Sequence, residues 1–348
     1  MTRTDAHDEV CDEPNAAGET PLFDPGRRAD VLPARDVPLG GLRGMTVSRS
    51  LPQREVPTIG AWCFLDRFGP QRTTMRVEPH PHIGLQTVTW PLTGEIRHRD
   101  SVGSDVVLRP GALNLMTSGH GISHSEYSVT DEPIDLDALQ LWVALPENAR
   151  HGDHGFESHE GLPTVALAVS QRTAASDTAS DTADAVAVVV MGTFAGTTSP
   201  ATTYTPIVGA ELRVPAGTTV SLPLESAWEH GLALIDGDMR AWDEHGEPLP
   251  DPGAGDILYL GNRRTKVTVG TSRGARIFLL GGEPFPDDLV MWWNFVGRSH
   301  EEVAEARREW EARAPRFGHV IGHDDTRVPA PPMPEVRLTP RRRRSVSP

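Results

Sequence analysis

The stretch HPHIGLQTVTWPL, residues 80–92, decides how this chain folds, and its beginning has a counterpart further along the chain in the tripeptide HSE. The first stretch begins with His80 and His82, and the tripeptide contains His124 and Glu126. In each pair, one residue separates two metal-binding side chains. In a β-strand, residues i and i+2 point to the same face. Two such strands facing each other across a barrel would direct three imidazoles and one carboxylate at one point. Such a ligand set suits a divalent metal such as iron.

The residues around both pairs predict short strands joined by tight turns. Residues 86–92 are rich in β-forming residues, and the turn-forming residues 93–95 (TGE) follow them. The second pair comes directly after the glycine-punctuated segment 118–121. The chain contains 14 histidines, so a pair separated by one residue can also arise in a solvated loop. The neighbouring strands and turns favour a metal site in a small β-barrel over that alternative.

An internal repeat predicts two barrels. Its first copy contains Gly94, Asp100, Gly103 and Pro110-Gly111, and its second copy contains Gly237, Asp243, Gly246 and Pro252-Gly253 at nearly the same spacing. Both copies continue into an apolar, strand-like segment, at 112–116 and at 257–260. A strand-and-turn unit that occurs twice favours an all-β chain built from two similar barrels.

The repeat also predicts that only one barrel binds metal. The four candidate ligands lie 14 and 12 residues before Gly94 and 30 and 32 residues after it. At these offsets from Gly237 the second copy has Pro223, Glu225, Val267 and Val269, and the histidine nearest to any of them is His230. We therefore expect the second barrel to lack this metal site and to fill the corresponding space with apolar side chains.

Seven segments carry a resemblance to a known family. They are FLDRFGP (64–70), HPHIGLQTV (80–88), HRDS (98–101), MTSGHGISHSE (116–126), LQLWV (139–143), LLGGEP (279–284) and WWNFV (292–296). In this order they resemble the pirin family of the cupin superfamily over about residues 35 to 312. The resemblance implies two cupin-type, jelly-roll β-barrels, with one iron-type metal in the N-terminal barrel.

The family pattern also implies the ligands. Its three histidines and one glutamate fall on His80, His82, His124 and Glu126. A general cupin has a glutamate four residues after the second histidine, where this chain has Gln86. The pirin pattern takes its carboxylate from the second motif instead, and this chain agrees with it.

The rest of the chain is divided by composition. We expect a flexible N-terminal tail (1–32), an N-terminal metal-binding cupin barrel (33–150), an interdomain connection with a flexible insertion (151–190), a metal-free C-terminal cupin barrel (191–298), a helix packed on the barrels (299–314) and a disordered Pro- and Arg-rich tail (327–348). The helix prediction rests on Ser299 as N-cap, on Glu301 and Glu302 in the first turn, and on Pro315 as the end. The run of arginines at 341–344 is interpreted as solvated rather than as an anion-binding patch.

Composition restricts the class of protein. The chain has 348 residues, long enough for two domains, and a formal net charge of −15, which argues against direct binding to nucleic acid. It has no run of about 20 apolar residues, so we expect no membrane span. Residues 1–19 are polar and acidic, unlike a secretory signal, and the two cysteines, Cys11 and Cys63, do not suggest a disulfide framework. We therefore expect a cytoplasmic protein.

The resemblance implies two functions of different classes. The first is a quercetin 2,3-dioxygenase-type oxidoreductase that uses Fe(II) to bring dioxygen to a quercetin-like flavonol or another enolic or catecholic compound, with Glu126 as a catalytic base. The second is a redox-sensitive binding protein that modulates a transcription factor or a metabolic enzyme, in which the iron's oxidation state alters the surface seen by a protein partner. Other divalent metals remain compatible with the ligand set.

Other histidines allow further interpretations. His98 could point outward on its strand and His120 could line the entrance, and either could hold a ligand in orientation. Residues 151–160 contain three histidines and three acidic residues, but their irregular spacing favours a polar interdomain loop over a second metal site.

Overall fold

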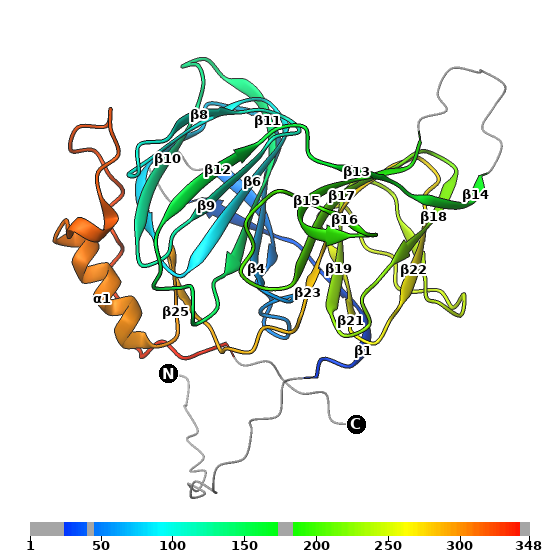
Figure 1. The fold of residues 1–348 in the computed structure, drawn as a ribbon. Coiled ribbons are helices and arrows are strands. Elements are labelled where there is room, and N and C mark those ends of the chain that lie inside the picture. Colours follow the sequence, from blue (N-terminus) through cyan, green and yellow to red (C-terminus); the bar gives the residue numbers. More distant parts are fainter. Residues whose placement is uncertain (1–23, 40–44, 173–183, 342–348) are drawn as a thin grey trace, which may run out of the picture.

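Two β-barrels make up most of the computed structural model, which describes residues 24–39, 45–172 and 184–341 (Figure 1). The first barrel contains β2 (Arg35–Leu39), β3 (Met45–Leu51), β4 (Trp62–Thr73), β5 (Arg76–His82), β6 (Leu85–Thr93), β7 (Ile96–Asp100), β8 (Asp105–Leu108), β9 (Leu113–Thr117), β10 (Ile122–Ser128), β11 (Ile134–Ala144) and β12 (Gly155–His159). The prediction of an all-β chain with two barrels and a C-terminal helix is confirmed.

The second barrel follows the same plan. It contains β1 (Arg27–Leu32), β13 (Thr164–Ala166), β14 (Ala168–Arg172), β15 (Val186–Phe194), β16 (Thr197–Thr198), β17 (Ile207–Val214), β18 (Thr218–Pro223), β19 (Glu229–Gly237), β20 (Arg240–Trp242), β21 (Ile257–Gly261), β22 (Lys266–Gly270) and β23 (Ala275–Gly282). The described strands of both barrels pair antiparallel, as expected for hairpin-connected sheets.

Sheet order shows that the two barrels are copies of one unit. The large sheets run β12-β9-β6-β11-β4-β3-β2 and β1-β21-β19-β23-β17-β15-β13, and the small sheets contain β5-β10-β7 and β18-β22-β20 in matching order. Gly94 and Gly237, the equivalent turn glycines, have φ values of 83° and 87°. A Cβ at either position would collide with a carbonyl oxygen, so both copies require glycine there.

Strands of both barrels come from segments that the sequence analysis assigned to a tail or to the interdomain connection. Residues 27–32, assigned to the tail from the sequence, form β1, which pairs with β21 of the second barrel. In the connection 151–190, β12 extends the large sheet of the first barrel and β13 pairs with β15 of the second. Residues 1–23 of the expected N-terminal tail and residues 173–183 of the expected insertion lie outside the described residues.

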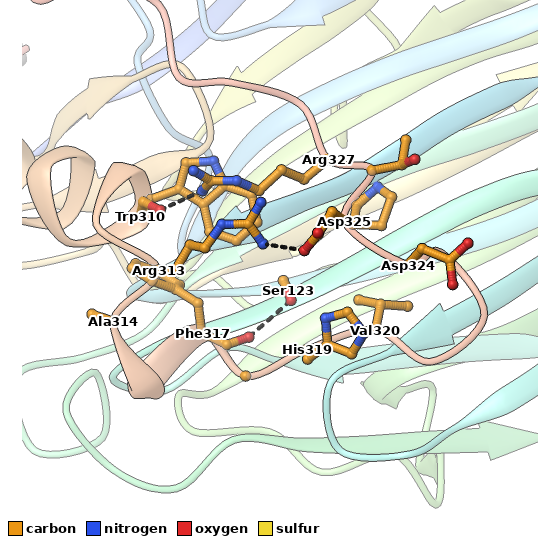
Figure 2. Close-up of a pocket in the computed structure, with 13 residues that line it drawn as sticks. Ser123, Trp310, Arg313, Ala314, Phe317, His319, Val320, Asp324, Asp325 and Arg327 are labelled. Carbon is orange, nitrogen blue, oxygen red and sulfur yellow. Dashed lines mark hydrogen bonds and ion pairs between the residues drawn. The ribbon is translucent and has the colours of Figure 1, made fainter.

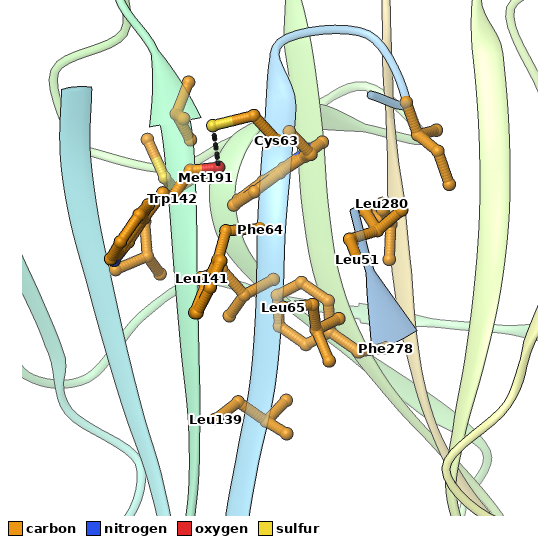
Figure 3. Close-up of a cluster of buried hydrophobic side chains, with 14 of the residues drawn as sticks. Leu51, Cys63, Phe64, Leu65, Leu139, Leu141, Trp142, Met191, Phe278 and Leu280 are labelled. Atoms are coloured by element: carbon orange, nitrogen blue, oxygen red, sulfur yellow. Dashed lines mark hydrogen bonds between the residues drawn. The ribbon is translucent and has the colours of Figure 1, made fainter. Parts of the chain in front are cut away.

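A continuous apolar core joins the barrels. Side chains from β4 and β11 of the first barrel pack against Met191, Phe278 and Leu280 of the second (Figure 3). The rings of Trp62 and Phe278 meet edge to face across this core, with their centroids 6.2 Å apart. Because the two large sheets share one core, neither barrel covers its own outer face by itself.

A buried carboxylate fixes the contact between the barrels. Trp90 of β6 donates from Nε1 to Oε2 of Glu211 on β17, over 2.6 Å. Burial opposes ionisation of Glu211, but hydrogen bonds from Arg276, Arg213 and Trp90 hold the pKa of this carboxyl below its usual value. Glu211 is therefore a buried anion that stays charged because it is fully paired.

The single α-helix of the described chain, α1 (His300–Glu311), lies where the sequence predicts it. The Ser299 side chain accepts from the backbone N–H of Glu302, and Val303, Ala306 and Trp310 form the buried face. This face packs on the hairpin of β24 (Val290–Trp292) and β25 (Phe295–Gly297) and on Ile83 of the first barrel. The helix therefore lies beside the first barrel, although the chain reaches it from the second (Figure 1).

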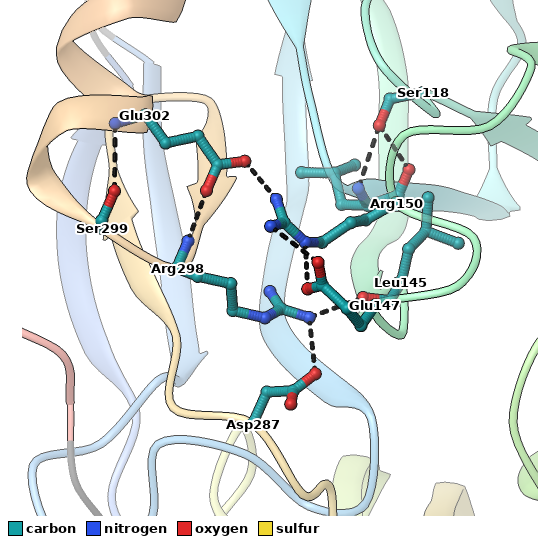
Figure 4. Close-up of polar contacts among 9 residues, drawn as sticks. Ser118, Leu145, Glu147, Arg150, Asp287, Arg298, Ser299 and Glu302 are labelled. Carbon is teal, nitrogen blue, oxygen red and sulfur yellow. Dashed lines mark hydrogen bonds and ion pairs between the residues drawn. The ribbon is translucent and has the colours of Figure 1, made fainter.

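Polar contacts secure the start of α1 to the first barrel (Figure 4). The Glu302 carboxylate accepts from the backbone N–H of Arg298, over 2.8 Å, and from the guanidinium of Arg150 in the loop after β11. Arg298 in turn donates to the carbonyl of Leu145, over 2.8 Å, and to Asp287, over 3.0 Å. No helix in the described part of the chain is long and apolar enough to span a lipid bilayer.

Residues 327–341, which the sequence analysis assigned to a disordered tail, contact the first barrel and α1. The backbone N–H of Val328 donates to the carbonyl of Pro79 on β5, over 2.8 Å, and the carbonyl of Val328 accepts from Trp310 Nε1, over 2.9 Å. Ala330 is buried against α1. The many prolines suggested disorder because such a segment forms few backbone hydrogen bonds, yet it packs here in an extended form. Residues 342–348 lie outside the described residues.

We expect Trp90→Phe to lower the free energy of unfolding by about 1.5–3 kcal/mol, because it removes a buried hydrogen bond to a charged acceptor. Equilibrium denaturation of the full-length chain measures this loss. Trp292→Phe, at a half-buried tryptophan beside α1, is the control and should change stability less. Equal losses in the two variants would mean that the bond between Trp90 and Glu211 contributes little to the interface.

Candidate metal centre

Three histidines meet inside the first barrel. His80 and His82 end β5, and His124 lies on the neighbouring strand β10, directly opposite His80 in the antiparallel register. One nitrogen from each ring lies within 4.8 Å of the others, and the Nε2 atoms of His82 and His124 are 3.1 Å apart. Two nitrogens bound to one metal at 2.0–2.1 Å and roughly at right angles are about 3 Å apart. The spacing therefore fits a common metal ion.

Hydrogen bonds leave suitable atoms facing this point. Nδ1 of His80 lies 2.9 Å from the carbonyl oxygen of Glu78, to which it can only donate. The His80 ring therefore carries its proton on Nδ1 and offers the lone pair of Nε2. A fixed tautomer of this kind is what a metal-ligating imidazole requires.

Burial keeps the three rings neutral. Desolvation lowers the pKa of His80 to about 4 and the pKa values of His82 and His124 well below the usual range. His80 is 8% exposed, and His82 and His124 are each 1% exposed. Protonation therefore does not compete with a metal near neutral pH, and the three converging rings could hold one cation between them.

A relay of hydrogen bonds orients His124. Its Nδ1 lies 3.3 Å from Nδ1 of His98 on β7, and Nε2 of His98 lies 3.1 Å from Oδ2 of Asp100. His98 also stacks on Phe156, with ring centroids 4.5 Å apart. Of the two interpretations of His98, an outward-pointing ring does not fit this geometry, and a ring that holds a ligand in orientation does. The chain Asp100–His98–His124 places the proton of His124 on Nδ1 and leaves Nε2 free for a metal.

Glu126 lies in the same barrel interior but outside the three-histidine cluster. The pairing of β10 with β5 slips by one residue between His124 and Glu126, so Glu126 stands opposite Val77. The Thr89 hydroxyl lies 3.4 Å from the Glu126 carboxylate. Burial raises the pKa of Glu126, against the opposing effects of His98 and Thr89. The role of Glu126 as a fourth ligand therefore stays a prediction.

A band of polar side chains lies beside Glu126, which the sequence analysis missed. Thr89, Asn114 and Gln140 are Cα partners on β6, β9 and β11, so they share the inner face of the large sheet. The Thr89 hydroxyl lies 3.1 Å from the Gln140 amide oxygen. Asn114 is buried, and neither its amide nitrogen nor its oxygen has a partner among the described residues. The two-residue period of each strand shows which residues share a face. The register between the strands, which the sequence does not show, is needed to see that these three side chains lie together.

Aromatic rings surround the histidines. The Trp142 ring meets His82 edge to face at a centroid distance of 5.4 Å and stacks on Phe64 at 4.1 Å. The barrel interior therefore combines imidazoles, flat apolar surfaces and the polar band. This combination suits an aromatic ligand that carries hydroxyl groups.

The outer face of β10 is held by the C-terminal segment 315–328. The Ser123 hydroxyl donates to the carbonyl of Phe317, over 2.8 Å (Figure 2). His323 lies 2.8 Å from the Ser125 hydroxyl and 3.2 Å from the Tyr127 hydroxyl. These outer residues alternate with His124 and Glu126 on the inner face, so this segment braces the strand that carries them. A small cavity of about 190 Å³ remains between the segment and β5.

The remaining sequence candidates are engaged elsewhere. His120 stacks on His154, and Nε2 of His159 lies 3.0 Å from the Glu157 carboxylate. Of the described residues, only His80, His82 and His124 form a cluster that could hold a metal, so residues 151–160 form no second one.

In the second barrel the space is filled as expected. Val267 and Val269 of β22 are fully buried opposite Leu222 and Val220 of β18. These aliphatic side chains lie on the strands that correspond to β10 and β5, which carry the candidate ligands of the first barrel.

Comparison with known protein families identifies two matching domains in the chain. The Pirin family matches residues 44–143, and the Pirin C-terminal cupin domain matches residues 209–318. A Pseudomonas aeruginosa protein that carries the provisional name quercetin 2,3-dioxygenase is 40% identical over 305 residues, which cover 86% of this chain and 89% of that protein. A pirin-like protein of Caulobacter vibrioides is 31% identical over 293 residues, which cover 81% of this chain and 92% of that protein.

A solved structure resembles this chain over nearly its whole length. The crystal structure of quercetin 2,3-dioxygenase from Acinetobacter baumannii is similar to this chain with a TM-score of 0.78 and 35% sequence identity. The similarity covers 90% of this chain and 98% of that one. The two-barrel arrangement is therefore shared over nearly the whole length of both proteins.

We expect His98→Phe to weaken metal binding by roughly tenfold to a hundredfold without abolishing it, because it keeps the ring stack on Phe156 but removes the hydrogen bond that orients His124. Competition with a chelator of known affinity measures the change. Asp100→Asn should produce a smaller loss in the same direction. Unchanged affinity in both variants would show that the relay does not position His124.

We expect His323→Ala to weaken metal binding by roughly tenfold, although His323 touches no ligand, because Ser125 and Tyr127 lose their common partner behind β10. The matched control is His300→Ala, since His300 of α1 accepts from the backbone of Leu338 and does not contact β10. Equal metal affinities of the two variants, with equal melting temperatures, would contradict a positioning role for His323.

Proposed function

Because the chain belongs to the pirin family of cupin proteins, we propose that it is an iron-dependent dioxygenase acting on quercetin-like flavonols or on other enolic or catecholic compounds. The observation that carries the proposal is the convergence of His80, His82 and His124, three buried and neutral imidazoles, inside an aromatic-lined barrel. The relatives named as quercetin 2,3-dioxygenases support the same reaction class.

The metal site of this proposal consists of His80, His82, His124 and Glu126. A bound Fe(II) would supply the Lewis acidity and the redox chemistry that dioxygen requires. The chain itself supplies orientation: Asp100 and His98 fix the tautomer of His124, and Glu78 fixes that of His80. Other divalent metals satisfy the same nitrogen ligands.

Glu126 is the residue that we assign to proton transfer. Its pKa is raised by burial, which brings a carboxyl group closer to the range in which it exchanges protons efficiently near neutral pH. In the proposed reaction its carboxylate accepts the proton of the substrate's acidic hydroxyl group. Thr89 and Gln140, which lie beside it, can accept or donate hydrogen bonds to the remaining hydroxyl groups of such a substrate.

A second candidate function is a redox-sensitive binding protein that modulates a transcription factor or a metabolic enzyme. The low exposure of the three histidines favours it, since the most exposed ring, His80, is only 8% exposed. In this role a change in the charge of the metal would be felt by buried neighbours such as Asp100 and would be passed to a protein partner. Turnover distinguishes this role from the first.

Anaerobically iron-loaded protein given quercetin should consume oxygen, and His124→Ala should lose both the bound iron and the oxygen uptake. His120→Ala is the matched control, because this nearby histidine bonds the carbonyl of Gly152 instead of facing the cluster. Elemental analysis and an oxygen electrode measure the two quantities. Iron bound at full occupancy without oxygen uptake, for quercetin and a panel of catechols, would move the assignment to the binding protein.

Glu126→Gln separates ligation from proton transfer in the same assay. If Glu126 is mainly the base, the variant retains iron while its turnover falls by roughly a hundredfold or more. If Glu126 is mainly a ligand, iron affinity falls together with turnover. Full activity with full iron content would exclude both roles.

A further inference from the structure

The second barrel has a cavity of its own, of about 440 Å³, which lies within the size range of small-molecule sites. Apolar and aromatic side chains make up much of its wall, and two ionisable groups join them: Phe194, Ile207, Trp228, Leu279, Glu225 and His230. None of these residues takes part in the metal centre. The cavity therefore needs an explanation separate from the chemistry of the first barrel.

The cavity lies at the end of the barrel that corresponds to the metal centre. Pro223, which lines it, ends β18, just as His82 ends the equivalent strand β5. Below it, Leu222 and Val267 close the barrel with an aliphatic layer. The second barrel has therefore lost its metal ligands but has kept an open mouth, which is where barrels commonly bind small molecules.

The polar groups of the cavity define what it can bind. His230 is 2% exposed, and burial lowers its pKa to about 4 against the opposing effect of a hydrogen bond to the Trp228 backbone, so its ring is neutral near pH 7. That bond engages the ring N–H, and the other ring nitrogen is an acceptor for a ligand hydroxyl group. Glu225 is exposed at the rim. Within the described lining there is no lysine or arginine, so an anionic ligand would find no counter-charge and would be repelled by Glu225.

The shape of the lining favours a flat ring. Trp228 is half-buried and stacks on His230, with ring centroids 6.5 Å apart and planes at 24°. Phe194 and Ile207 supply further apolar surface, and the hydroxyl groups of Thr203 and Thr205 lie at the edge. An aromatic ligand can cover the open part of the Trp228 ring while it bonds to the imidazole.

We propose that the mouth of the second barrel is a metal-independent binding site for an uncharged, planar aromatic molecule bearing at least one hydroxyl group, which packs against Trp228 and hydrogen-bonds to His230. This site is independent of the proposed oxygenase function and lies in the other barrel. It gives the chain two places for aromatic ligands, of which only one involves a metal.

Calorimetric titration of the full-length, metal-loaded protein with 2-naphthol tests the proposal, and 2-naphthoate, which has the same rings and a carboxylate, is the comparison ligand. We expect saturable binding of 2-naphthol and binding of 2-naphthoate that is weaker by about tenfold or more. Glu225→Gln should narrow this difference, because it removes the charge that repels the carboxylate. Equal affinity for both ligands would overturn the assigned charge selectivity.

Amino-acid substitutions in and outside the cavity test whether 2-naphthol binds there. Trp228→Ala should weaken 2-naphthol binding by about tenfold or more, and Trp292→Ala, at a half-buried tryptophan outside the cavity, should not. Thr205→Trp, which fills the cavity from its edge without altering the core, should also abolish binding and serves if Trp228→Ala does not fold. Binding that survives Thr205→Trp, or that disappears in His124→Ala, would overturn the proposal, as would the absence of saturable 2-naphthol binding.

Discussion

The antiparallel pairing of β5 with β10 is the constraint on which the rest of the site depends. It sets His80 directly opposite His124, and the two-residue period of a strand then brings His82 to the same face. A shift of the register by one residue would turn these side chains to the other face of the sheet. Two further sets of contacts stabilise this pairing. The C-terminal segment hydrogen-bonds to the outer face of β10, and the relay through His98 contacts His124 on its inner face.

The strand β10 serves two different purposes on its two faces. Inside, His124 meets the other histidines at a buried position, where desolvation opposes protonation of its ring. Outside, Ser123, Ser125 and Tyr127 are hydrogen-bonded to residues almost 200 positions further along the chain. The C-terminal segment supports the strand from this outer face, and it continues past residue 318, where the family match to the C-terminal cupin domain ends.

The sequence predicted what depends on local spacing, and it failed where distant partners decide. The period-2 spacing within each pair predicted that the histidines converge, and the repeat around Gly94 and Gly237 predicted two barrels. The two ligand strands do not face each other across the barrel as expected, because β5 and β10 are hydrogen-bonded neighbours in one sheet. The inward orientation of His98 was not predictable, because it depends on which face of β7 lies inside. The contacts of residues 327–341 were not predicted, because their partners, such as Pro79, lie about 250 residues away. Composition alone describes such a segment as a free tail.

The pairing of the N-terminal strand β1 with β21 of the second barrel means that the two barrels are not separable units. The first described strand of the chain, β1, completes the large sheet of the barrel that is made last, and its partner β21 lies more than 220 residues further along. A ribosome therefore releases the N-terminal strand long before its docking surface exists. A fragment that began at the second barrel would leave Ile257, Leu258 and Tyr259 on an unpaired edge, and exposed apolar edges of this kind invite pairing with other chains. The two copies of the repeat are consequently bound to each other by topology as well as by their shared core, and they must be inherited as a pair.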